Sequence, residues 1–177
     1  MTYGWALMVV MVVGLAMWQL GIFNMGSNAV TTQGFAKIAP QIAGTGLSAA
    51  GVFTGTFTNA AGTKIELTGV RVYSGNTDTI LCCSHKAAGD GCNNAGSDVG
   101  GLTYSDFGGD EIAPVSTGQN FAVVLGGTGA ESGAKCQIDS AEVAKPYIIR
   151  VEVDYNILIG TQTMSHTSSG TIRGPFE

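Results

Sequence analysis

Charged side chains are scarce in this sequence of 177 residues. Asp, Glu, Lys and Arg make up 12% of it, against roughly 25% in typical soluble domains. The 8 basic residues are scattered, and 13 acidic residues leave a net charge of −5. A surface that binds phosphates needs clustered positive charge. The composition therefore excludes a highly charged cytosolic surface and predicts that nucleic acid is not a partner.

Proline and histidine are also few, with 4 and 2 residues, and no Asn-x-Ser/Thr triplet is present. N-linked glycans are therefore not expected. Glycine is frequent, at 27 residues, but follows no fixed period. Collagen-like and low-complexity chains are excluded by that pattern. The length suits one domain of ordinary size with an appendage.

What the sequence does contain is a long apolar run near its start. Gly4 to Phe23 is apolar except for Gln19, and residues 1–36 hold no acidic or basic side chain. Twenty helical residues at about 1.5 Å each span about 30 Å, the thickness of the hydrocarbon core of a bilayer. Tryptophans near both ends resemble the aromatic anchors of membrane helices. The run predicts a long N-terminal hydrophobic helix.

Two common interpretations of the run fit poorly. A cleavable signal peptide has a basic start and a small-residue cleavage site, and neither borders this run. A single-span anchor carries Lys or Arg on its cytoplasmic flank, whereas the first basic residue here is Lys37. We therefore expect a basic leader to precede the run. A permanent membrane anchor remains open as an alternative, because it needs the same apolar composition.

The residues around the run carry a family resemblance. The string Met1-Thr2-Tyr3-Gly4-Trp5-Ala6-Leu7, followed by the run's end at Leu20-Gly21-Ile22-Phe23-Asn24, resembles archaeal type IV pilin-like proteins with class III signal peptides. The resemblance implies membrane insertion, trimming by a prepilin peptidase, and extraction by a pilus assembly machinery into helical filaments with the N-terminal helices in the core. The glutamate that many such pilins carry near the mature N-terminus is absent here. On this resemblance we expect the helix to pack against other copies through Tyr3, Trp5, Leu7, Val10, Val13, Leu15, Met17, Trp18, Leu20 and Phe23.

The remainder of the chain alternates apolar and polar residues with period two, which predicts strands. From Tyr147 to Ile159 every second residue is apolar, and the residues between them are charged or polar from Arg150 to Asn156. A pattern this long predicts a half-buried strand with a fixed register. Further strands are predicted at Phe35–Ile42, Thr77–Cys82, Asn120–Leu125 and Thr161–Arg173.

A hairpin is predicted from Val52 to Tyr73. Phe53 and Phe57 share one face, Asn59 to Gly62 have turn chemistry, and the alternation resumes afterwards. Past Gly69 the apolar residues change phase. Either a β-bulge at this glycine or a break into two strands accounts for the change.

The expected fold class is α+β, with a long N-terminal hydrophobic α-helix followed by an all-β immunoglobulin-like sandwich head. Short strands separated by Gly-rich loops are typical of a sandwich. Residues 1–24 form the expected helix, residues 25–50 a connector, and residues 51–177 the head.

Four cysteines, Cys82, Cys83, Cys92 and Cys136, lie in the expected head. Outside the cell disulfides persist, so two bridges are expected. Adjacent cysteines bond only with strain, which leaves two pairings open. We favour Cys83 with Cys92 and Cys82 with Cys136.

Other chemistry has little support. Cys82, Cys83, His85 and Cys92 could bind zinc or iron, but adjacent cysteines ligate one ion awkwardly. The Asp90–Asp98 loop lacks the ordered spacing of a calcium loop. Residues Gly126–Lys135 lack the contiguous Gly-Lys-Ser/Thr of a phosphate loop.

Candidate catalytic residues are also few. His166 lies in a Ser/Thr-rich segment, and Asp106, Asp110 and Glu111 lie in a glycine-rich stretch typical of solvated turns. We therefore expect no enzyme and no cofactor or metal.

Two functions follow as expectations. The first is a structural subunit, a major pilin, of an extracellular filament on the cell surface, inserted in the membrane before assembly and partnered by copies of itself. The second is a monomeric, membrane-anchored extracytoplasmic domain that binds a ligand or a protein.

Overall fold

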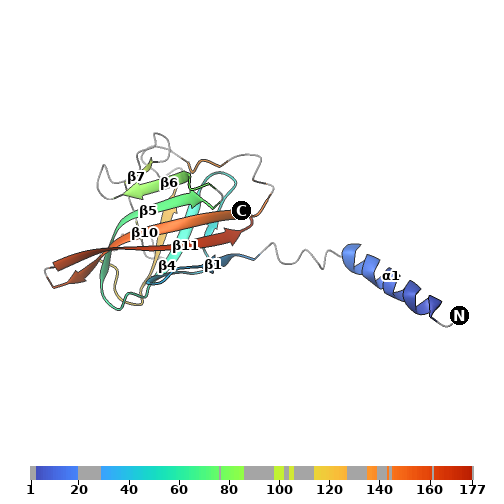
Figure 1. The fold of residues 1–177 in the computed structure, drawn as a ribbon. Coiled ribbons are helices and arrows are strands. Elements are labelled where there is room, and N and C mark those ends of the chain that lie inside the picture. The colour runs from blue at the N-terminus through green and yellow to red at the C-terminus, as the bar shows by residue number, and fades with distance from the viewer. Residues whose placement is uncertain are drawn as a thin grey trace.

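The computed structural model describes residues 3–19, 29–75, 77–85, 98–101, 104–105, 114–126, 135–138, 143, 145–160 and 162–176. For residues 98–101 and 104–105 it describes the main chain only. Among these residues one helix lies apart from a body of strands, as Figure 1 shows.

The helix, α1, extends from Gly4 to Gln19. The expectation of a long N-terminal helix was wrong, because these 16 residues span about 24 Å. Gln19 is the polar residue of the apolar run, and Gly21, a poor helix former, follows it in the sequence. Leu20 to Phe23, the rest of the expected helix, lie outside the described residues. Within the described part of the chain, no helix has both the length and the apolar character that crossing a membrane requires.

The strands form two sheets. The first has the order β1-β11-β10-β5-β6-β7, in which only β6 and β7 are parallel. Its members are β1 (Thr31–Gln33), β5 (Ile65–Ser74), β6 (Ile80–His85), β7 (Asp98–Gly101), β10 (Tyr147–Ile159) and β11 (Gln162–Gly174). Figure 1 shows β10 and β11 as two long strands crossing the body.

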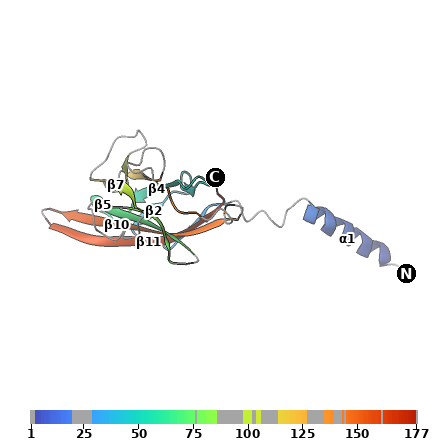
Figure 2. The ribbon, with the colours of Figure 1, turned by 90° about the horizontal axis from the view of Figure 1, so that it is seen from above.

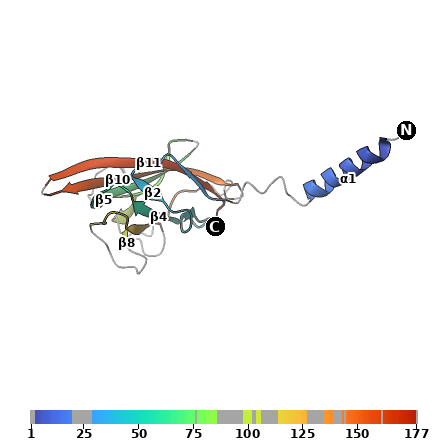
Figure 3. The same cartoon turned by 90° about the horizontal axis from the view of Figure 1, so that it is seen from below.

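The second sheet has the order β2-β4-β9-β8, and β3 also pairs with β4. Its members are β2 (Ile38–Pro40), β3 (Gly46–Leu47), β4 (Phe53–Asn59), β8 (Tyr104–Ser105) and β9 (Asn120–Leu125). Figures 2 and 3 show the two layers from above and below, with β10 and β11 in one layer and β4 in the other.

A shared core fills the space between the sheets. Phe57 and Phe121 of the second sheet stack with ring centroids 5.7 Å apart, and both are fully buried. The first sheet contributes aliphatic side chains such as Val70 and Val151 to the same cluster. The core therefore belongs to the strands alone, and the residues of α1 take no part in it.

The expectation of an immunoglobulin-like head was also wrong. An immunoglobulin sandwich has sheets ABED and CFG and a buried tryptophan on strand C. Here the first strand, β1, pairs with the last strand, β11, and the tryptophans, Trp5 and Trp18, both lie on α1. Alternation in a sequence indicates which face of a strand is buried but not which strand lies beside it, and that limit explains the error.

The predicted hairpin from Val52 to Tyr73 was wrong for the same reason. β4 pairs with β2, β3 and β9, whereas β5 pairs with β6 and β10. The chain crosses from one sheet to the other just after Asn59. The buried Asn59 amide donates hydrogen bonds to the main-chain oxygens of Thr63 (2.8 Å), Val115 (3.1 Å) and Ser116 (3.1 Å).

The phase change in β5 is a β-bulge, so that alternative is confirmed. Asp154 pairs with Gly69 and Tyr155 pairs with Leu67, which leaves Thr68 as the extra residue. A side chain at position 69 would place its Cβ 2.5 Å from the ring of His85. The glycine therefore lets β6 approach β5 at the bulge.

The strand predictions differ in accuracy. The strand at Tyr147–Ile159 is confirmed as β10, and the one at Asn120–Leu125 as β9. β11 begins and ends one residue later than predicted, β6 lies three residues later, and β2 covers the middle of the predicted Phe35–Ile42. The range expected to be a connector also supplies β1 and β3, which were not predicted.

Candidate functional site

The apolar residues of α1 form the most unusual surface of the described chain. Of the side chains expected to pack between copies, eight are described, and all of them are exposed. Their exposed fractions run from 42% at Met17 to 81% at Tyr3. The eight are Tyr3, Trp5, Leu7, Val10, Val13, Leu15, Met17 and Trp18. The remaining two, Leu20 and Phe23, lie outside the described residues.

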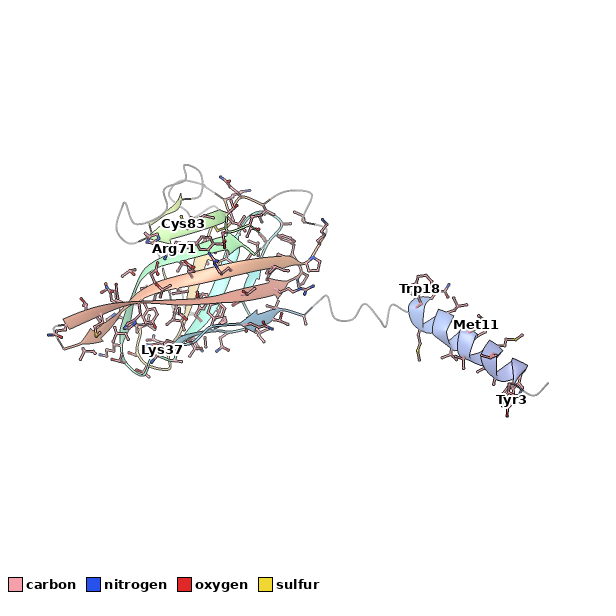
Figure 4. All side chains as sticks on the ribbon, viewed as in Figure 1. Tyr3, Met11, Trp18, Lys37, Arg71 and Cys83 are labelled. Atoms are coloured by element: carbon pink, nitrogen blue, oxygen red, sulfur yellow. A yellow bond between two sulfur atoms is a disulfide. The ribbon has the colours of Figure 1, made fainter. Side chains whose placement is uncertain are left out.

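The apolar side chains surround α1 and do not form a stripe. Figure 4 shows Tyr3, Met11 and Trp18 projecting in different directions from the helix. Met8, Val9, Met11 and Val12 are exposed as well, although they were not among the residues predicted to pack between copies. Their uninterrupted apolar run in the sequence was the signal that could have found them. A helix that is apolar on all sides is stable when protein or lipid covers it on all sides.

The end turns of α1 lack the charged residues that would stabilise the helix in water. Its first turn has no acidic residue and its last turn no basic residue. Charges at those places would stabilise the helix dipole in solvent. The helix therefore depends on contacts with its surroundings for its stability.

The disulfide between Cys82 and Cys136 ties β6 to the segment at residues 135–138. It is the pairing favoured from the sequence. Cys136 also donates its main-chain N–H to Gly51 (2.9 Å), and Gln137 donates to Leu81 (2.9 Å). Cys83 is disulfide-bonded too, and its expected partner, Cys92, lies outside the described residues.

Because these cysteines are bonded in disulfides, the alternative in which they bind zinc or iron is not supported. Metal sites use the thiolate form of cysteine, and a sulfur in a disulfide is not a thiolate. Among the described residues, no group of three or more His, Cys, Asp or Glu side chains could hold a metal. The Asp90–Asp98 loop, which the sequence argued against as a calcium site, lies largely outside the described residues, as do residues 127–134 of the Gly126–Lys135 loop.

The two histidines lie in different surroundings. The ring of His166 on β11 stacks on the buried ring of Tyr155, with centroids 5.9 Å apart. His85 lies on β6 beside Gly69. The carboxylates at Asp106, Asp110 and Glu111 lie outside the described residues.

A charged cluster covers the outer face of the first sheet. Arg71 contacts Asp154 at 2.7 Å and Glu152 at 3.5 Å. Arg150 contacts Asp78 at 2.6 Å and Glu152 at 3.6 Å, and its guanidinium lies 4.4 Å from the ring centroid of Tyr73. Each carboxylate of the cluster therefore has a cation beside it.

The surroundings of Tyr73 raise the pKa of its phenol above the ordinary value of 10.0. Burial is the largest cause, and the negative charge of Glu152 acts in the same direction. Arg71 and Arg150 partly oppose the shift. The phenol is therefore neutral at physiological pH.

A small cavity of about 170 Å³ opens beside the start of β10. Its lining is largely apolar and includes Leu81, Tyr147 and Phe176. Of the described residues that line it, Lys145 alone is charged. Ligand pockets usually measure roughly 300–1,000 Å³. The cavity is small for a ligand and brings no set of catalytic groups together.

No protein-family model matches the chain, and no curated protein matches it.

Proposed function

We propose that the chain is a structural subunit, a major pilin, of an extracellular type IV pilus-like filament. In this proposal the α1 helices of many copies pack together, and the β-rich parts face outward. The observation that carries it is the exposure of apolar side chains on all sides of α1. Many neighbouring helices would cover such a surface completely.

Burial energetics support the need for a covered helix. Moving one Val, Leu or Met side chain from water into packed surroundings contributes about 1.5–3 kcal/mol. α1 exposes large apolar residues along its whole length, so it is strongly unstable when isolated in water. Transfer from lipid to a helix bundle gains little hydrophobic energy, because lipid tails are as apolar as leucine. Close packing between large side chains such as Trp5, Leu7 and Trp18 would therefore provide the specificity.

The rest of the chain suits the outer wall of such a filament. The strands enclose their own core, and a disulfide, a bond that persists in extracellular surroundings, ties β6 to residues 135–138. With only 12% charged residues, neighbouring copies would repel one another little at high density. The resemblance of residues 1–24 to archaeal type IV pilin-like proteins adds the expectation of membrane insertion and prepilin-peptidase processing before assembly.

A matched pair of substitutions tests the proposal. Val10→Lys puts a charge in the middle of α1, and Val124→Lys makes the same change at a valine of β9 that is 54% exposed. We expect negative-stain microscopy of sheared cell-surface material to show filaments for the wild type and Val124→Lys, and none for Val10→Lys.

The competing function predicts a different result. If the chain is a membrane-anchored binding domain, the wild type is recovered only from detergent-solubilised membranes as a single copy. That result, or filaments that survive Val10→Lys, would overturn the proposal.

A further inference from the structure

One edge of β11 is unpaired along most of its length. β10 pairs with every residue from Gln162 to Gly174 on one side. On the other side β1 pairs only with the three residues Thr171–Arg173. Within the part of the chain that the structure describes, no strand pairs with the outer side of residues 162–168. We call residues 162–168 the free edge.

The free edge is accessible to a partner. Residues 162–167 are exposed on both faces of the ribbon. β5, the other neighbour of β10, pairs only as far as Ile157. Figures 1 and 2 accordingly show the ends of β10 and β11 extending beyond the rest of the sheet. No other described element therefore blocks an approach to this edge.

The free edge also lacks the features that prevent strand addition. Soluble proteins protect such edges with lysine and other charges, proline, or β-bulges. The free edge reads Gln-Thr-Met-Ser-His-Thr-Ser, with no Lys, Arg, Asp, Glu or Pro. Its thirteen-residue pairing with β10 has no register shift. It is therefore a regular, uncharged template for another strand.

The charges nearest to the edge are neutralised. Asp154, opposite Thr167 on β10, contacts Arg71 at 2.7 Å and accepts a hydrogen bond from the Thr167 hydroxyl at 2.6 Å. Glu152 contacts Arg71 and Arg150. Two copies approaching edge to edge would therefore not bring these carboxylates together unpaired.

We propose that the free edge binds the free edge of a second copy of this chain, in antiparallel orientation, about a two-fold axis at Ser165. Ser165 then faces its own counterpart, Thr163 faces Thr167, and Met164 faces His166. Threonine and serine pairs favour antiparallel sheets, and no like charges face each other in this register. Seven residues form about 23 Å of paired strand. Because each segment complements itself, a second copy fits better than an unrelated peptide.

The pairing has a consequence for the filament, which rests on the proposed function. β1, which pairs with β11, begins at Thr31. Thr31 lies opposite Arg173, far from the turn between β10 and β11. Antiparallel pairing about Ser165 therefore separates the two Thr31 residues by roughly 50 Å, at opposite ends of the joined ribbon. The two copies would belong to different filaments, so the contact links filaments side by side. A single strand pair is weak, but repetition along two filaments multiplies its strength.

Cysteine cross-linking of the full chain in detergent micelles tests the edge itself. Ser165→Cys places a thiol at the proposed axis, where paired Cα atoms lie about 4.5–5.5 Å apart, a separation that a disulfide spans. Thr171→Cys is the matched control, because Thr171 is exposed on the same strand but β1 covers its edge. We expect at least ten-fold more oxidised dimer from Ser165→Cys. Equal yields, or no dimer from Ser165→Cys, would overturn the proposal.

Cross-linking between two different variants tests the proposed register, in which Thr163 faces Thr167. A mixture of Thr163→Cys and Thr167→Cys chains should yield more mixed dimer than either variant yields alone as homodimer. No excess of mixed dimer would refute pairing about Ser165.

Microscopy then separates this contact from filament formation. The double substitution Thr163→Lys with Ser165→Lys should leave filaments intact but unbundled, while Thr171→Lys filaments remain bundled. Bundles that persist in the double variant would overturn the link between filaments. If the wild type forms no filaments, the proposed function fails, and the cross-linking result alone still decides whether the free edges pair.

Discussion

The side-chain amide of Asn59 donates a hydrogen bond to the main-chain oxygen of Val115, 56 residues further along the chain. Val115 in turn forms a β-bridge with Ile65, exchanging main-chain hydrogen bonds of 3.0 and 2.8 Å. The Asn59 side-chain oxygen also accepts the N–H of Ala61 at 2.9 Å. This one side chain therefore holds the corner at which the chain passes from one sheet to the other.

Replacing Asn59 with alanine should lower the free energy of unfolding by about 2–4 kcal/mol. The reason is that Asn59 is fully buried and its side chain makes four hydrogen bonds to main-chain atoms, each of which contributes about 0.5–1.5 kcal/mol. Urea unfolding followed by circular dichroism measures the change. Asn120→Ala, at an exposed residue of β9, is the control and should change stability by less than about 0.5 kcal/mol. Equal effects at the two positions would contradict the role of Asn59.

Removing the Cys82–Cys136 bridge should also destabilise the strands. The two cysteines are separated by 54 residues, and closing a loop of that length stabilises by about 4 kcal/mol through the entropy of the unfolded chain. The double variant Cys82→Ala with Cys136→Ala leaves no unpaired thiol at this site. We expect its free energy of unfolding to fall by about 2–4 kcal/mol in urea titrations. A variant as stable as the oxidised wild type would show that the bridge adds nothing.

High pH should destabilise the protein through Tyr155. Burial raises the pKa of its phenol in the folded state above 10.0. Below pH 10 the phenol is neutral in both states, and the stabilising contribution is complete. As pH rises through the folded pKa, that contribution is lost, because the unfolded chain releases the proton more readily.

Tyr155→Phe should therefore show a smaller fall in stability above pH 10 than the wild type. The free energy of unfolding measured at several values between pH 8 and pH 11.5 provides the comparison. Curves of equal slope above pH 10 would contradict the prediction, whatever the difference in stability at neutral pH.

The alternation of apolar and polar residues was sufficient to predict the bounds of some strands. β10 was predicted with its bounds because its alternation continues over thirteen residues, and burial of one face fixes the register. Its last apolar residue, Ile159, is 58% exposed. The sequence could not reveal this, since β5 pairs only as far as Ile157.

Pairing between strands was less predictable. β4 and β5 have the alternation and the turn residues of a hairpin, yet they lie in opposite sheets. Both arrangements bury the same faces, so the pattern cannot distinguish them. The hydrogen bonds of Asn59 to a distant segment decide between them. The short β1 and β3 were missed because two or three residues are too few for a period to be recognised.

The sequence by itself determined which residues are apolar, where the alternation places a buried face, and that the start of the chain has no charge with which to face water. These properties follow from the side chains and their order. The tertiary structure alone decided which strands are neighbours, which cysteine lies within reach of Cys82, and which edge of β11 stays open. Those relations join residues far apart in the chain, and they exist only when the two sheets close over a common core.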